Sequence, residues 1–231
     1  MQQRTIKLNN HSWDVTLRDD ADESIANEIF KFREYRIVEP FIAKADHAIL
    51  DIGAHSGLFS LYVRSFNASA PIIAFEPEPK NFALLTKHIE VNQLKNITPV
   101  KKAIARESGK RKLVIMPDNL NHFLSPDKNL FSKKETVAVE ARSLIDALSD
   151  HSIAQASLVK MDIEGGEYDI IEDLTPELAS KVEAFLLEYH DAKGDHKRLE
   201  EQFRQHGFSV QTFPSHFEKS MGFIFARNKR V

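Results

Sequence analysis

The sequence predicts an α/β fold, in which a mostly parallel sheet carries helices on both faces and closes with an antiparallel strand pair. Three observations support this prediction. Apolar runs of strand length alternate with amphipathic segments of helical spacing between residues 48 and 206. The first strand passes through a short turn with two glycines into a helix, as in nucleotide-binding sheets. Two consecutive strand-like segments, 207–213 and 221–226, end the pattern.

The composition is typical of one globular domain, which we assign to residues 1–231. Hydrophobic residues make up 42% and charged residues 28% of the chain, which excludes general disorder. The net charge of −3 predicts no broad basic surface, so no nucleic-acid partner is expected. The absence of cysteine excludes disulfides and thiolate metal sites and fits a cytoplasmic protein. We expect no signal peptide and no membrane span, because no apolar run approaches the ~20 residues of a transmembrane helix.

The first 44 residues predict a hairpin followed by a helix. Residues 2–17 alternate between apolar and polar positions around the turn signal Asn9-Asn10. Residues 22–44 place apolar side chains at helical spacing, and Pro40 is expected to interrupt that helix.

The central part of the chain predicts strands and helices in the alternating order of a parallel sheet. Strands are expected at 48–52, 72–75, 97–104, 157–161 and 183–189. Helices are expected at 56–66, 79–92, 143–149, 165–174 and 195–206. Ligands bind such sheets at the carboxyl ends of the strands, so residues at those ends are the candidates for a site.

Residues 106–141 interrupt this alternation with many glycine, proline, asparagine and aspartate residues. Short strands fit 111–115 and 136–141, but the stretch 117–135 is too long for an ordinary connection. Long loops of this kind are often functional or mobile, and we expect this insertion to cover the substrate.

The first strand ends at Asp51 and leads into a loop that contains Gly53, His55 and Gly57. A side chain at either glycine would keep a ligand from reaching the backbone. A carboxylate here repels a pyrophosphate and attracts an ammonium group, so the loop favours a cofactor with a cationic end, such as S-adenosylmethionine. Asp51 could instead only cap the following turn. His55 lies between the glycines and is expected in the same cofactor site.

Glu76 ends the second strand, 19 residues after Gly57. A carboxylate there can accept hydrogen bonds from both ribose hydroxyls of an adenosine, although a strand-end acid can also simply be solvated. Because Glu76 occurs together with Asp51 and the glycine loop, we assign it to cofactor binding.

Polar residues also follow the later strands. Asp162 precedes a helix and is expected to face the cleft, with Glu164 beside it, although acids also favour helix N-termini in general. His190 ends the next strand and is either a base or a partly exposed loop histidine. Either Asp162 or His190 takes a proton from the substrate, or the three residues bind a divalent cation. We expect no metal, since no tight metal-binding spacing is present.

These motifs together resemble the FkbM family of class I methyltransferases. The similarity rests on Asp-Ile-Gly-Ala-His-Ser-Gly at 51–57, Ala-Phe-Glu-Pro at 74–77, Lys-Met-Asp-Ile-Glu-Gly-Gly-Glu at 160–167 and Glu-Tyr-His at 188–190. The four motifs cover about residues 45–191, and the first 40 residues and the insertion match poorly.

The resemblance implies a Rossmann-like sheet of seven strands, S-adenosylmethionine as the methyl donor, and O-methylation of a sugar or another small molecule. By position, it implies that Asp51, Gly53 and Gly57 hold the methionine part, Glu76 the ribose and Ala103 the adenine. The acceptor and the oligomeric state stay open.

Two alternatives remain at this point. A dinucleotide-dependent oxidoreductase is disfavoured by Asp51 and by the missing three-glycine spacing. A catalytically inactive binding module is disfavoured by the intact acids. His55 replaces an asparagine that is usual in the family, which leaves its contact with the cofactor open.

Overall fold

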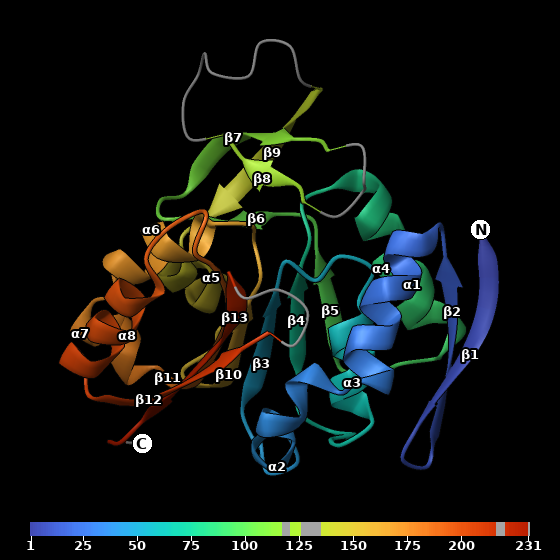
Figure 1. The fold of residues 1–231 in the computed structure, drawn as a ribbon, viewed down its shortest axis with the longest axis horizontal. Helices are drawn as coiled ribbons and strands as arrows, with labels where there is room; N and C mark the ends of the chain where they lie inside the picture. Colours follow the sequence, from blue (N-terminus) through green and yellow to red (C-terminus); the bar gives the residue numbers. More distant parts are fainter. Residues whose placement is uncertain (117–120, 126–134, 216–219, 231) are drawn as a thin grey trace.

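The predicted α/β architecture is confirmed by a computed structural model, which describes residues 1–116, 121–125, 135–215 and 220–230. Neighbouring strands of its central sheet are parallel, except that the second strand in the order given below runs antiparallel to both of its neighbours. The expected antiparallel pair is therefore present (Figure 1). The seven strands lie in the order β12 (Phe208–Pro214), β13 (Met221–Asn228), β11 (Val182–His190), β10 (Ala156–Met161), β3 (Ala48–Ile52), β4 (Ile72–Phe75) and β5 (Ile97–Val100).

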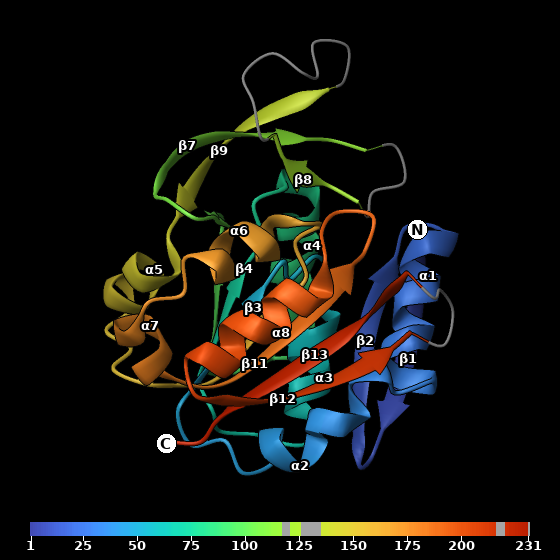
Figure 2. The same ribbon diagram turned by 60° about the vertical axis from the view of Figure 1, so that its left-hand side comes forward.

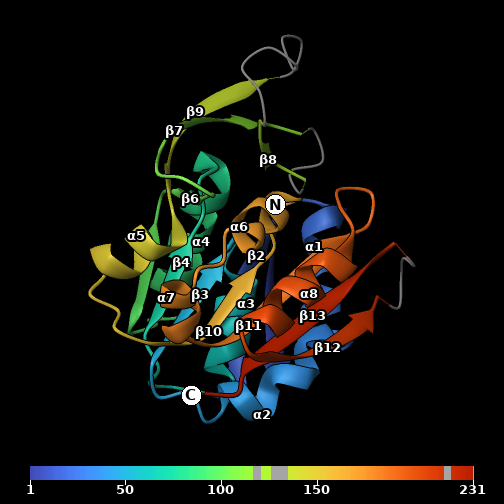
Figure 3. The ribbon, with the colours of Figure 1, turned by 90° about the vertical axis from the view of Figure 1, so that its left-hand side faces the viewer.

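Helices cover both faces of this sheet (Figure 3). One face carries α5 (Leu144–Asp150), α6 (Gly166–Glu172), α7 (Pro176–Ser180) and α8 (His196–Gln205). The other face carries α3 (Leu58–Arg64), α4 (Pro79–Val91) and the N-terminal segment. Successive residues of a strand pack into the two apolar cores in turn. Ile49 packs on the face covered by α3 and α4, and Leu50 packs on the face covered by α5 to α8. Helix α7 lies where no element was expected, and no described helix is long and apolar enough to cross a membrane.

The N-terminal segment forms the predicted hairpin and then a broken helical stretch on the opposite side of the molecule from α5 and α7 (Figure 2). The break expected at Pro40 lies instead at Arg33, whose φ of 53° is left-handed. Pro40 occupies the first turn of a new helix, where its missing N–H has no helical partner to lose. The elements are β1 (Gln2–Leu8), β2 (His11–Leu17), α1 (Asp20–Ala26), the π-helical η1 (Asn27–Lys31), the 3-10 helix η2 (Glu34–Val38) and α2 (Glu39–Ile42).

The predicted insertion forms a second, four-stranded sheet above the central one (Figure 1). The single strand predicted for 97–104 is wrong, because the Lys102 amide bonds back to the Val100 carbonyl oxygen and the chain turns into the second sheet. Of the cover expected at 117–135, residues 117–120 and 126–134 lie outside the described residues. The order is β6 (Ala103–Ile104), β9 (Thr136–Arg142), β7 (Gly109–Val114) and β8 (Phe123–Leu124).

Candidate active site

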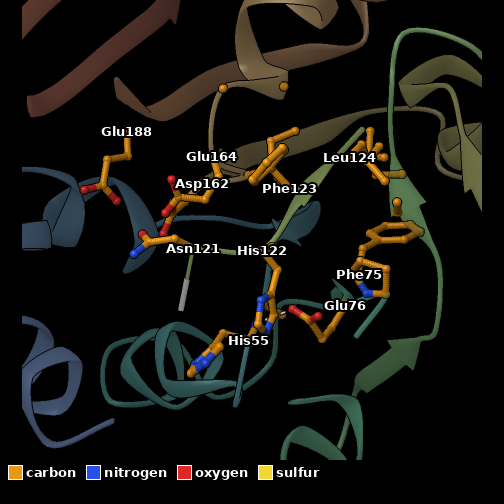
Figure 4. Close-up of a pocket in the computed structure, with 18 of the residues that line it drawn as sticks. His55, Phe75, Glu76, Asn121, His122, Phe123, Leu124, Asp162, Glu164 and Glu188 are labelled. Carbon is orange, nitrogen blue, oxygen red and sulfur yellow. Dashed lines mark hydrogen bonds between the residues drawn. The ribbon is translucent and has the colours of Figure 1, made fainter. Parts of the chain in front are cut away.

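A large cavity lies at the carboxyl ends of the central strands, where the topology predicts a ligand site. Its volume of about 1150 Å³ is sufficient for a cofactor and a second small molecule. The walls come from the loops after β3, β4, β10 and β11, from the N-terminal segment and from β8. Figure 4 shows Asp162, Glu164 and Glu188 together on one side and His55 with Glu76 on another.

Asp51 is fully buried behind the wall of this cavity and does not border it. Its Oδ2 accepts a hydrogen bond from Ser60 Oγ at 2.8 Å. Its Oδ1 accepts no hydrogen bond within the described part of the chain and lies 3.6 Å from Lys160 Nζ. Burial raises the pKa of Asp51, and Lys160 and Ser60 oppose this rise. Asp51 therefore affects the electrostatics of the cavity through its charge and through its contact with Lys160, which borders the cavity.

The two loop glycines are required by packing between protein segments. At Gly53, with a φ of 72°, a Cβ atom would lie 1.9 Å from the Asp162 carbonyl oxygen. At Gly57, with a φ of 83°, it would lie 2.5 Å from Leu85 Cδ1. Gly53 borders the cavity and Gly57 does not. The glycines thus hold the loop against β10 and α4, a reason different from the ligand approach expected from the sequence.

Glu76 is buried at the end of β4 and borders the cavity, as predicted. Its carboxylate accepts two backbone hydrogen bonds, from the His55 amide at 2.8 Å and from the Glu78 amide at 2.7 Å. Burial raises the pKa of Glu76 to about 7, against the effect of these two donors. Glu76 therefore both shapes the loop and faces the place where a ribose is expected.

The His55 side chain joins a polar cluster from the N-terminal segment. Its Nε2 lies 2.9 Å from Arg18 Nη2 and 3.9 Å from Asp22 Oδ1. Arg18 also donates two side-chain hydrogen bonds to Asp22 and one to Asn81 Oδ1. His55 borders the cavity and also connects the glycine loop with α1, a contact that sequence spacing could not predict.

Asp162 faces the cavity in a group with Lys160 and Glu188. Lys160 Nζ lies 3.7 Å from Asp162 Oδ2 and donates a hydrogen bond to the Gly53 carbonyl oxygen at 3.0 Å. Burial and the Asp162 charge raise the pKa of Glu188 well above its ordinary value. Glu188 also shares a hydrogen bond with Asp162, which contributes to this rise. Burial lowers the pKa of Lys160, but Asp162, Asp51 and Glu188 together raise it above its ordinary value.

Glu164 and His190 form a second pair in the cavity, with 3.9 Å between Glu164 Oε2 and His190 Nε2. Glu167 supports the loop that carries Glu164. It is fully buried, and its carboxylate accepts hydrogen bonds from the amides of Ile163 at 2.5 Å and Gly165 at 2.8 Å. Asp162 and His190 thus border one cavity from neighbouring strands, as predicted, but they have different polar partners.

Ala103 is buried in β6, opposite Ala141 of β9, and borders the cavity. Together with β8, it brings the second sheet to the site. Within the described residues, the one set of three potential metal ligands is Asp46, His47 and Glu183, which does not border the cavity.

Several residues that border the cavity were not assigned to a site from the sequence. A lysine inside an otherwise apolar strand was the available signal for Lys160. Glu188 was considered as a strand-end residue but was given no role. Tyr35, which also borders the cavity, looks in sequence like an ordinary core aromatic at helical spacing.

The chain is similar in sequence to known methyltransferases. The family model described as "Methyltransferase FkbM domain" matches residues 51–210. Methyltransferase 1 of Beauveria bassiana (strain ARSEF 2860) is 27% identical over 205 residues, which are 81% of this chain and 81% of the relative. The 31-O-demethyl-FK506 methyltransferase FkbM of Streptomyces tacrolimicus is 22% identical over 233 residues, 89% of each chain.

The fold is also found among solved structures. SMU.1697c from Streptococcus mutans, solved in complex with SAH, superposes with a TM-score of 0.51 at 8% identity, covering 84% of this chain and 97% of that chain. At this identity, the likeness concerns the fold alone.

Proposed function

The chain belongs to the FkbM family of methyltransferases, and from this premise we propose that it methylates a hydroxyl of a small molecule or glycan with S-adenosylmethionine as donor. The observation that carries the proposal is the set of strand-end acids around one cavity: Glu76, Asp162, Glu164 and Glu188. The comparisons lend no support to the alternative of a dinucleotide-dependent oxidoreductase.

The residues present fit the donor. When bound, S-adenosylmethionine supplies an electrophilic methyl group on a sulfonium centre. Glu76 would accept hydrogen bonds from the ribose hydroxyls, and Ala103 would border the adenine. The Gly53 backbone and the charge of Asp51, whose Oδ1 accepts no hydrogen bond among the described residues, suit the cationic methionine end.

The chain's own contribution to the reaction is to orient the acceptor and to remove its proton. We assign the base to His190, because the Glu164 carboxylate 3.9 Å from Nε2 can stabilise the imidazolium that forms. Asp162, held between Lys160 and Glu188, would accept a hydrogen bond from the acceptor hydroxyl and orient it.

Two observations support a small molecule or a glycan as the acceptor. The cavity volume of about 1150 Å³ leaves room for a small molecule or a sugar beside the donor. The FkbM relative is named for methylation at an oxygen, and this supports a hydroxyl acceptor here.

The test combines binding and transfer. Calorimetry should detect S-adenosylmethionine binding at micromolar concentration, and a labelled methyl donor with a panel of hydroxylated small molecules and glycans should identify an acceptor. Absence of donor binding to the folded protein would refute the proposed function.

A further inference from the structure

The N-terminal segment forms one wall of the cavity, although it lies outside the matched family model. Glu28 in η1 and Glu34 and Tyr35 in η2 border the space that Asp162 and Glu188 border from the strands. The wall therefore places two more carboxylates and a phenol at a site that already contains several acids.

Glu34 has no charge partner. It makes no hydrogen bond or ion pair among the described residues, and the charged group that affects its pKa is another acid, Glu28. Burial, and then Glu28, raise the pKa of Glu34 to about 7. The hydrogen bond given to the Glu28 carboxylate comes from the neutral Ser24 hydroxyl at 2.8 Å.

The basic side chains of the cavity do not compensate these two acids. Lys160 lies against Asp51 and Asp162. The other basic side chains also have partners elsewhere: Arg106 pairs with Asp173, Lys102 with Glu140 and Arg111 with Glu107, and Lys193 lies over the Phe123 ring. A half-buried carboxylate without a cation is unfavourable, and a positively charged ligand would relieve this cost.

Tyr35 provides a second, independent observation. It is only 6% exposed, and its ring packs edge-on against Phe59 at 5.0 Å and Phe223 at 5.4 Å between ring centroids. Tyr35 borders the cavity, and no hydrogen bond of its hydroxyl is found among the described residues, so the hydroxyl is available to a ligand. Burial and the charges of Asp162 and Glu188 raise the pKa of Tyr35 well above its ordinary value, so the hydroxyl stays protonated beside the acids.

We propose that the methyl acceptor carries a protonated amine in addition to its hydroxyl, and that Glu34, with Glu28, binds this amine while the Tyr35 hydroxyl bonds to the acceptor beside it. This inference rests on the proposed function and names its substrate class. An ammonium group donates up to three hydrogen bonds, and the two carboxylates of Glu34 and Glu28 can accept them. A metal ion fits less well, since the described residues that can supply three ligand atoms to one ion lie elsewhere.

The experiment uses three matched probes: the methyl glycosides of glucosamine, N-acetylglucosamine and glucose. Each is titrated calorimetrically into the full-length protein saturated with S-adenosylhomocysteine. The amine probe is expected to bind about tenfold or more tightly than the two neutral probes, as for a charge-assisted hydrogen bond. Glu34→Gln is expected to remove this preference and to leave the affinity for the neutral probes unchanged.

Glu23→Gln is the matched control, because Glu23 lies on α1, pairs with Arg4 at 2.9 Å and does not border the cavity. It should retain the amine preference. Tyr35→Phe keeps the packed ring and is expected to weaken all three probes by the same factor.

The amine site would be overturned by equal affinity for the three probes or by no detectable binding of any of them. It would also be overturned if Glu34→Gln and Glu23→Gln lost the amine preference to the same extent. Stronger binding of Mg²⁺ than of the amine probe, abolished by Glu34→Gln, would overturn it as well. Binding of S-adenosylhomocysteine tests the proposed function separately, since it can remain intact while the amine preference fails.

Discussion

Replacing Glu76 with Ala is expected to weaken donor binding and also to loosen the cofactor loop. The carboxylate accepts the His55 and Glu78 amides at 2.8 and 2.7 Å, and each such bond to a charged group contributes about 1.5–3 kcal/mol. The hydrogen bond to the ribose is also lost, which costs about 1.5–3 kcal/mol of binding free energy, so the affinity for S-adenosylmethionine should fall about 10–150-fold. Because two such backbone bonds are lost, the free energy of unfolding should fall by about 3–6 kcal/mol.

The pH dependence of donor binding tests the same reasoning. Because burial raises the pKa of Glu76 to about 7, its carboxyl group is largely protonated below that pH and ionised above it. The ionised form accepts hydrogen bonds from both ribose hydroxyls, so the wild-type affinity should rise between about pH 6 and pH 8. In Glu76→Gln, this rise should be absent.

The assay is calorimetric titration with S-adenosylmethionine across this pH range, with chemical unfolding of each variant in parallel. Glu90→Ala, in helix α4 and away from the cavity, is the control for general effects of substitution. A folded Glu76→Ala variant with wild-type donor affinity would refute the assignment of Glu76 to the donor.

His190→Gln is expected to lower turnover by about 10²–10⁴-fold without changing donor affinity, the usual range for loss of a base, and turnover within threefold of wild type would exclude His190 as that base. Asp162→Asn should also lower turnover while donor affinity stays nearly intact; equal losses of both would move Asp162 to the donor side. Chelation with EDTA should leave turnover unchanged, and a loss restored by Mg²⁺ or Mn²⁺ would contradict the metal-free mechanism. His55→Asn should keep donor affinity within about threefold, because the hydrogen bond to Glu76 comes from the backbone amide of residue 55. The free energy of unfolding should fall by about 1 kcal/mol, because the contact with Arg18 is lost. A variant that fails to fold would show that His55 is structural.

The N-terminal segment shows where local patterns were insufficient. Helical spacing over residues 22–44 was real, but the break lies at Arg33 and not at Pro40. A proline is compatible with the first turn of a helix, and only the packing of η1 and η2 against the rest of the protein decides which residue takes the left-handed conformation.

The sequence by itself determined the order of strands and helices, the family, and the acids at the strand ends. These depend on hydrophobic periodicity and on short motifs such as 51–57 and 160–167, which are properties of neighbouring residues. The positions of Glu76, Asp162 and His190 at one cavity followed because parallel strands end at one edge of a sheet.

Only the tertiary structure decided which of these residues face the cavity and what surrounds them. It placed Asp51 behind the wall, brought Lys160 between Asp51 and Asp162, and made Glu34 and Tyr35 part of the site. It also directed β6 into the second sheet. These arrangements arise from contacts between segments far apart in the chain, where burial and the competition among charges depend on distances that no local pattern contains.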